Sequence, residues 1–243
     1  MEEYILSCCS TVDLTEEQLK ENDIKYTCFH FYIDDQDYRD DFGRTISYKD
    51  FYDEIRAGKI TKTSQINVEE YAEFFEGFLK DGKDVLHVTL SSGISGTYNS
   101  AIIAKDMLSE KYPDRKIYIV DSLAASGGYG LLVLKMAQLK KEGLDIDKLN
   151  EWAIENRLRD NHWFFTTDLT YLIRGGRVSK TAGTIGNVLN ICPLLCVNYE
   201  GKLISKYKIR GKKKVIKAIV DKMVEMCDNG ENYDDECIIT QAD

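Results

Sequence analysis

The chain of 243 residues is 43% hydrophobic and 30% charged, contains two prolines and carries a formal net charge of −9. This composition predicts a folded globular protein and excludes a disordered or fibrous one. No apolar run approaches the roughly 18 residues of a membrane span, and the acidic start at Glu2 and Glu3 lacks the basic and apolar regions of a signal peptide. We therefore expect a cytoplasmic protein that does not insert into a membrane.

The first half of the chain alternates short apolar runs with helical segments. The pattern predicts strands at 4–8, 24–33, 85–90 and 117–120. It predicts helices from near Thr15, at 47–57, at 68–79, around 101–108 and at 125–141. An acidic loop or hairpin is predicted at 34–44 and a polar loop at 62–65. Strands separated by helices of this length are typical of βαβ units and a parallel sheet. The loops after Leu90 and Val120 then meet at the carboxyl edge of the sheet, where ligands bind in such folds.

The pattern changes after a helix near 147–159. The remaining predicted elements are a strand at 163–166, a short helix between Asp168 and Gly175, a helix at 185–189, a hairpin of strands at 194–197 and 203–209, a helix at 212–227 and a strand at 237–240. We therefore predict an α/β protein of two domains. Residues 1–160 form a Rossmann-like parallel sheet with helices, and residues 161–243 form a second α/β domain.

A run rich in serine and glycine joins one predicted strand to the next helix: Ser91-Ser92-Gly93-Ile94-Ser95-Gly96-Thr97. The first turn of a helix presents unpaired N–H groups and a partial positive charge, so it stabilises an anion without a basic side chain. Helix capping explains one hydroxyl but not four. The run matches neither the GK[ST] phosphate loop nor the G-x-S-x-G nucleophile motif. We expect an anion-binding loop.

Thr63 and Ser64 form a second hydroxyl pair, for which a capping turn is the simpler interpretation. The three histidines show no spacing that joins a nucleophile, a base and an orienting group, which argues against a hydrolase. The seven cysteines are odd in number and lack the CxxC pairs of a zinc site. The sequence therefore predicts reduced thiols and no metal centre.

Basic residues concentrate in one segment. Between Leu169 and Lys217, eleven Lys or Arg accompany a single acid, Glu200, so this segment carries +10 and the rest of the chain −19. A solvated face and a surface for an acidic or phosphate-bearing partner both fit this pattern. The segment includes Arg174 and Arg177 around a Gly-Gly turn, followed by Lys206, Lys208, Arg210 and Lys212 to Lys214.

Taken together, these motifs resemble the DegV family of bacterial fatty-acid-binding proteins. The segments that carry the resemblance follow one another in the family's order: Ser10-Thr11-Val12-Asp13-Leu14, Thr63-Ser64-Gln65, Ser91 to Tyr98, Asp121-Ser122, Asp168 to Leu172, Gly175 to Ser179, Pro193-Leu194-Leu195 and Lys208-Ile209-Arg210. The resemblance implies a two-domain α/β protein that holds one long-chain fatty acid, such as palmitate, stearate or oleate, in a tunnel between domains.

The resemblance also implies a role and a set of binding residues. The protein would be the acyl-carrying subunit of fatty acid kinase, with no catalysis and no cofactor of its own, and a separate ATP-binding subunit would phosphorylate the carboxylate. Thr63 and Ser95 would hydrogen-bond that carboxylate, with Ser64 and Ser92 nearby. A basic face with Arg174, Arg177 and Arg210 would meet the kinase subunit.

The chain departs from the family pattern in three places. Cys9 stands where Asp usually precedes Ser-Thr, and Ile66 stands where Pro usually follows Gln. The chain stops at Asp243, before the usual His-Thr-Gly-Pro-Gly segment, so we expect an incomplete C-terminal domain and a more open head-group site. Two other functions stay open. One is an enzyme that acts on a small anionic substrate with Ser95 or Cys9 as nucleophile, and the other is a nucleic-acid module at 169–217, which the negative remainder of the chain disfavours.

Overall fold

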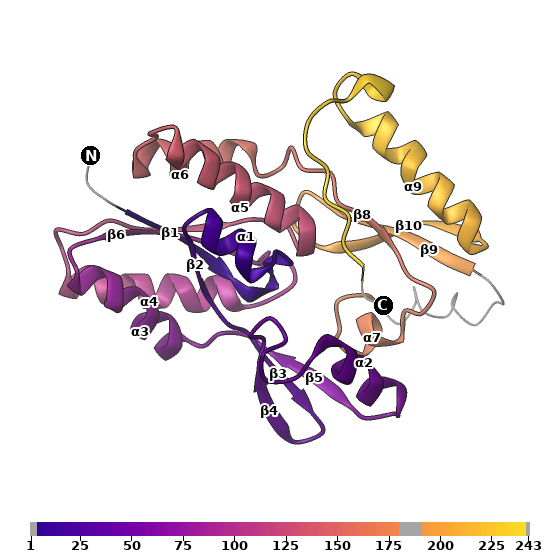
Figure 1. Ribbon diagram of the computed structural model, residues 1–243, viewed down its shortest axis with the longest axis horizontal. Coiled ribbons are helices and arrows are strands. Elements are labelled where there is room, and N and C mark those ends of the chain that lie inside the picture. The colour runs from indigo at the N-terminus through magenta and orange to yellow at the C-terminus, as the bar shows by residue number, and fades with distance from the viewer. Residues whose placement is uncertain (1–3, 180–190, 242–243) are drawn as a thin grey trace.

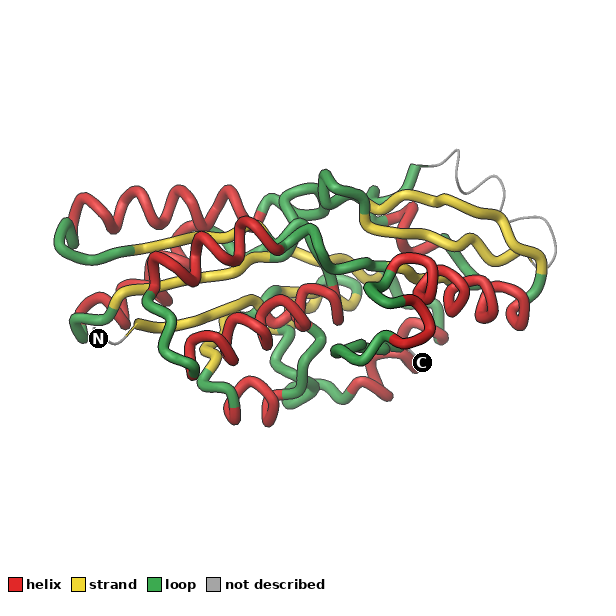
Figure 2. Tube along the Cα trace, turned by 90° about the horizontal axis from the view of Figure 1, so that it is seen from above, coloured by secondary structure: helices red, strands yellow, loops and turns green. Residues whose placement is uncertain are grey.

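The computed structural model describes residues 4–179 and 191–241. It contains two groups of elements that follow one another along the long axis (Figure 2). The larger group is built on a parallel four-stranded sheet in the order β2-β1-β6-β7. Its strands are β1 (Tyr4–Cys9), β2 (Ile24–Thr27), β6 (Asp84–Thr89) and β7 (Ile117–Asp121). The predicted α/β class with a parallel sheet is confirmed.

Helices cover both faces of this sheet (Figure 1). They are α1 (Glu16–Glu21), α3 (Val68–Lys80), α4 (Thr97–Lys111), α5 (Ser126–Lys141) and α6 (Ile146–Asn156). Every residue of the two central strands β1 and β6 is buried, as expected for strands covered on both faces. The loops after β6 and β7 therefore lie at the same carboxyl edge, as predicted.

A small antiparallel sheet extends from the larger group, and it corrects two predictions. Its strands, in the order β4-β3-β5, are β3 (His30–Ile33), β4 (Gln36–Arg39) and β5 (Thr61–Ser64), with α2 (Tyr48–Arg56) beside them. The single strand predicted at 24–33 is wrong, because the N–H of Phe29 donates to Ser10 Oγ at 3.0 Å and the chain there changes sheets. The loop predicted at 62–65 is largely strand β5, which pairs with β3.

The second group is an antiparallel sheet in the order β10-β9-β8, made of β8 (Trp163–Phe165), β9 (Ile191–Val197) and β10 (Leu203–Arg210). The predicted hairpin is confirmed as β9 and β10. Successive side chains along β9 point to opposite faces of this sheet. Leu194 packs with Val215 of α9 (Lys212–Met226), and Leu195 packs with Leu169 beside α7 (Thr170–Arg174).

The last described residues do not form the strand predicted at 237–240. Ile238 packs instead on the start of α5, where a Cβ added to Gly127 would lie 2.6 Å from Ile238 Cγ2. Ser126 Oγ lies 3.0 Å from Thr240 Oγ1 beside it. Residues 237–240 therefore lie against the start of α5 and are not part of a sheet. The helix predicted at 185–189 lies outside the described residues, and none of the helices within 4–179 and 191–241 is both long and apolar enough to cross a bilayer.

Candidate ligand-binding site

The Ser/Gly loop between β6 and α4 is a tight turn held by Ser91. The carbonyl of Ser91 accepts the N–H groups of Ile94 and Ser95, both at 3.1 Å. Its buried hydroxyl accepts the N–H of Gly93 at 3.0 Å and donates to the carbonyl of Gly201 at 2.8 Å. The Ser91 hydroxyl is therefore used to build the loop and is not available to a ligand.

Ser95 is placed differently. Its Oγ accepts the N–H of Thr97, the first residue of α4, at 3.2 Å. A serine hydroxyl has one donor hydrogen and two acceptor lone pairs, so this bond leaves the O–H donor unused. Among the residues that the structure describes, that O–H finds no acceptor. Ser95 therefore offers a hydrogen-bond donor at the positive end of a 15-residue helix.

Asp121, at the end of β7, holds the other side of the loop. Its Oδ1 accepts the N–H of Ser92 at 3.0 Å and the N–H of Leu123 at 3.1 Å. Ser92 itself is exposed. The Asp121-Ser122 pair, which carried part of the family resemblance, thus joins the loops that follow β6 and β7.

The Thr63-Ser64 pair lies beside the Ser/Gly loop, although it comes from another sheet. Gln65, which follows Ser64 at the end of β5, donates from Nε2 to Ser100 Oγ of α4 at 3.0 Å. A Cβ added to Gly96 would lie only 2.4 Å from Gln65 Oε1. The Gln65 side chain therefore connects the two hydroxyl clusters. Thr63 is exposed and Ser64 is half-buried.

The second group of elements touches the loop at two points. A Cβ added to Gly93 would lie 2.6 Å from the carbonyl oxygen of Glu200 in the β9–β10 turn. Arg177 donates from Nε to the carbonyl of Ile94 at 3.2 Å and from Nη1 to the carbonyl of Gly175 at 2.5 Å. Arg177, predicted to face a partner, thus also binds the anion loop.

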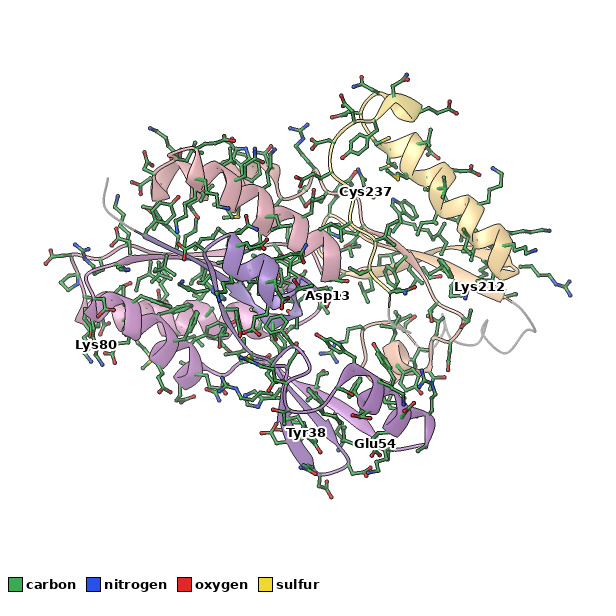
Figure 3. The ribbon with its side chains drawn as sticks, viewed as in Figure 1. Asp13, Tyr38, Glu54, Lys80, Lys212 and Cys237 are labelled. Carbon is green, nitrogen blue, oxygen red and sulfur yellow. The ribbon has the colours of Figure 1, made fainter. Side chains whose placement is uncertain are left out.

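The other two predicted basic residues lie apart from the loop contacts. Arg174 ends α7, and its guanidinium lies 5.7 Å from the ring centre of Tyr171. Arg210 is exposed at the end of β10, next to the basic start of α9. Figure 3 shows Lys212 there, at the outer end of the molecule.

Cys9 and His87 form a buried pair that the sequence reasoning missed. Both have no exposed surface, and Cys9 Sγ lies 3.7 Å from His87 Nε2. Burial raises the pKa of the Cys9 thiol and lowers the pKa of His87 to about 3, so both groups stay neutral. A neutral, inaccessible thiol is a poor nucleophile. The arrangement argues against Cys9 as the nucleophile of an enzyme.

Two cavities lie away from the hydroxyl clusters. One, of about 310 Å³, is lined by Arg157, His162 and Trp163 among others, and a second, of about 580 Å³, lies over Phe74 and Phe78. Neither has Thr63 or Ser95 in its wall, so the tunnel expected there stays a prediction. Across 4–179 and 191–241, His, Cys, Asp and Glu side chains form no cluster of three that could hold a metal ion.

Comparison with known proteins gives the family. A family model described as "Uncharacterised protein, DegV family" matches residues 9–242, nearly the whole chain. The chain belongs to the DegV family. A DegV domain-containing protein of Clostridium perfringens is 40% identical over 223 residues, which make up 92% of this chain and 77% of that protein. The predicted family resemblance is therefore confirmed.

Solved DegV structures share the fold. A DegV lipid-binding protein from Thermotoga maritima is 31% identical with a TM-score of 0.79, covering 92% of this chain and 77% of that one. The fatty acid kinase B3 protein of Streptococcus pneumoniae, solved with linoleic acid, is 26% identical with a TM-score of 0.80, covering 92% and 78%. The first of these relatives is thus a lipid-binding protein, and the second was solved with a fatty acid bound.

Proposed function

We propose that this DegV protein binds one long-chain fatty acid and holds its carboxylate at the Ser/Gly loop. The observation that carries the proposal is the O–H donor of Ser95 at the N-terminus of α4, which has no acceptor in the described part of the chain. Gln65, the residue after Ser64, bonds to Ser100 in the first turn of the same helix, which supports a second donor from the Thr63-Ser64 pair. Hydroxyl donors and a helix N-terminus together stabilise a carboxylate without any basic side chain.

The acyl chain supplies most of the binding free energy in this proposal. A charge-assisted hydrogen bond contributes roughly 1.5–3 kcal/mol, so Thr63 and Ser95 orient the head group but cannot alone retain a detergent-like ligand. A chain of about fourteen buried methylenes at about 0.8 kcal/mol each contributes more before the costs of binding are subtracted. The preferred acids, such as palmitate, stearate or oleate, then differ mainly in how their chains fit.

The protein presents its ligand to another protein. We infer that a separate ATP-binding kinase subunit phosphorylates the bound carboxylate and docks on the basic residues Arg174, Arg177 and Arg210. The +10 charge of residues 169–217 suits an acidic partner surface. The buried, neutral Cys9–His87 pair supports a binding role over a catalytic one.

The first experiment is native mass spectrometry of the protein purified from bacterial cells, followed by denaturation and identification of the released lipid. We expect one bound fatty acid per chain, with about 16 to 18 carbons, the length that the methylene count implies. A protein that is empty and also fails to take up added palmitate or oleate would contradict the proposal.

Two substitutions then test the head-group site. Ser95→Ala and Thr63→Ala should each weaken palmitate binding by about ten- to a hundredfold, the equivalent of one charge-assisted hydrogen bond. The matched control is Ser109→Ala, which removes a serine hydroxyl whose one bond within 4–179 and 191–241 is to the carbonyl of Lys105 in the same helix α4. The control should bind like wild type. Equal affinities in all four proteins, measured by equilibrium dialysis, would place the carboxylate elsewhere.

A further inference from the structure

A chain of buried polar groups lies on one face of the parallel sheet, between strands β1 and β6 and helices α3 and α4, and it ends at the proposed head-group loop. Ser7 Oγ lies 2.9 Å from His87 Nδ1, and His87 Nε2 lies 3.7 Å from Cys9 Sγ. Cys9 Sγ lies 3.3 Å from the hydroxyl of Tyr71, and that hydroxyl lies 2.7 Å from Thr97 Oγ1. All five residues have no exposed surface. Buried polar groups of this kind cost free energy unless they are paired, so the pairing persists.

Tyr71 is the member of this chain that reaches the loop. Its partner Thr97 begins α4, and the N–H of Thr97 is the group that Ser95 Oγ accepts. The Tyr71 hydroxyl therefore fixes Thr97 through its side chain, and the backbone N–H of Thr97 in turn fixes the Ser95 hydroxyl. Because the buried Tyr71 ring packs against both Phe75 and His87, its oxygen has little freedom to move.

Tyr71 also belongs to the segment that carries the second hydroxyl pair. It lies in the first turn and a half of α3, which follows β5 after Gln65, Ile66 and the helix cap Asn67. One hydrogen bond between Tyr71 and Thr97 thus ties the start of α3 to the start of α4. It thereby fixes the start of α3, the helix that follows the Thr63 strand, against the start of α4, which follows Ser95.

We propose that Tyr71 is a positioning residue for the fatty-acid carboxylate, acting through Thr97 to aim the Ser95 hydroxyl. This inference rests on the proposed fatty-acid function and adds a residue that touches no ligand. It means that loss of the Tyr71–Thr97 bond weakens the binding of a charged head group and leaves the binding of the acyl chain unchanged. A purely structural role would weaken binding of all ligands alike.

The test compares two ligands with the same chain and different heads, palmitate and hexadecanol, by equilibrium dialysis. Tyr71→Phe should weaken palmitate binding about three- to tenfold, as for loss of one ordinary hydrogen bond, and change hexadecanol binding less than about twofold. The matched control is Tyr129→Phe, another tyrosine without exposed surface, whose hydroxyl bonds to the N–H of Cys9 and the carbonyl of Val88. The control should leave the ratio of the two affinities unchanged.

Thr97 supplies an independent pair of variants if Tyr71→Phe fails to fold. Thr97→Val removes the hydroxyl and should lower the palmitate-to-hexadecanol ratio, whereas Thr97→Ser keeps the hydroxyl and should restore it. If wild type binds palmitate but Tyr71→Phe and Thr97→Val keep the wild-type ratio, the positioning role is wrong and the proposed function stands. If wild type binds neither ligand, both proposals fail.

Discussion

His87 illustrates how burial changes the chemistry of one residue. It lies on β6 with no exposed surface, with Ser7 Oγ at 2.9 Å and Cys9 Sγ at 3.7 Å from its ring nitrogens. Desolvation penalises the charged imidazolium, which lowers the pKa of His87 from 6.5 to about 3. At neutral pH the ring is a neutral hydrogen-bonding group of the core and does not act as a base.

The shifted pKa predicts an acid-sensitive fold. The unfolded chain protonates His87 below about pH 6.5 and the native chain only near pH 3, so the free energy of unfolding falls as the pH drops between these values. By linkage, His87 alone removes about 2 kcal/mol between pH 7.5 and pH 5. Urea unfolding of wild type and His87→Gln at both values measures this, because the variant should lose about 2 kcal/mol less. Equal losses would contradict the assigned pKa.

At the scale of elements, the Ser/Gly loop packs closely because Gly93 leaves room for the backbone of the β9–β10 turn. Gly93 faces the β9–β10 turn, where an added Cβ would lie 2.6 Å from the Glu200 oxygen and 2.7 Å from the Gly201 carbonyl carbon. A clash with backbone atoms cannot be relieved by a change of rotamer, as a clash with a flexible side chain can. A larger residue at Gly93 therefore has to separate the loop from the hairpin.

Gly93→Ala should destabilise the protein by about 1–3 kcal/mol, the usual cost of overpacking. It should also weaken palmitate binding, because the loop that carries Ser95 moves with Gly93. Gly77→Ala is the control: Gly77 lies within α3, with nothing within 4 Å of an added Cβ, so alanine there should stabilise the helix by about 0.5–1 kcal/mol. Thermal unfolding and dialysis measure both effects. A Gly93→Ala protein as stable as wild type would mean that the hairpin does not press on the loop.

At the scale of the molecule, both groups of elements contact the Ser/Gly loop, and charge is distributed unevenly between them. Ser91 donates to Gly201, and Arg177 donates to Ile94, so both contacts from the second group reach the proposed head-group site. The segment 169–217, which belongs largely to this second group, carries eleven of the 32 Lys and Arg residues but only one acid, Glu200. Of the three basic residues proposed to meet a partner, Arg177 is the one that contacts the proposed head-group loop, through the carbonyl of Ile94.

Arg210→Glu should slow association with the proposed ATP-binding kinase subunit several-fold at low salt, because exposed charges mainly steer encounter. The difference should shrink at high ionic strength, where exposed charges are screened. Arg210 is a better test than Arg177, whose replacement also disturbs the loop through Ile94. Lys20→Glu on α1 changes the net charge equally and should leave the rate unchanged. If Lys20→Glu and Arg210→Glu slow association alike, net charge and not this surface determines the rate.

Local patterns identified much of this architecture. The parallel strands, their helices and the β9–β10 hairpin follow from runs of apolar residues and the turns between them. The Ser/Gly loop was recognisable because its residues are consecutive and follow a buried strand. The proposed division into domains near residue 160 also came from the change of pattern, and it stays a prediction.

Tertiary structure decided what depends on residues far apart in the chain. Phe29 breaks the strand predicted at 24–33 only because Ser10 is there to accept its N–H. β5 has no apolar alternation and is a strand only because β3 pairs with it. The Ser7–His87–Cys9–Tyr71–Thr97 chain draws on β1, β6, α3 and α4, so no spacing in the sequence could reveal it. Sequence periodicity indicates which face of an element is buried. Hydrogen-bond partners that are distant in the sequence are determined only by how the folded chain brings them together.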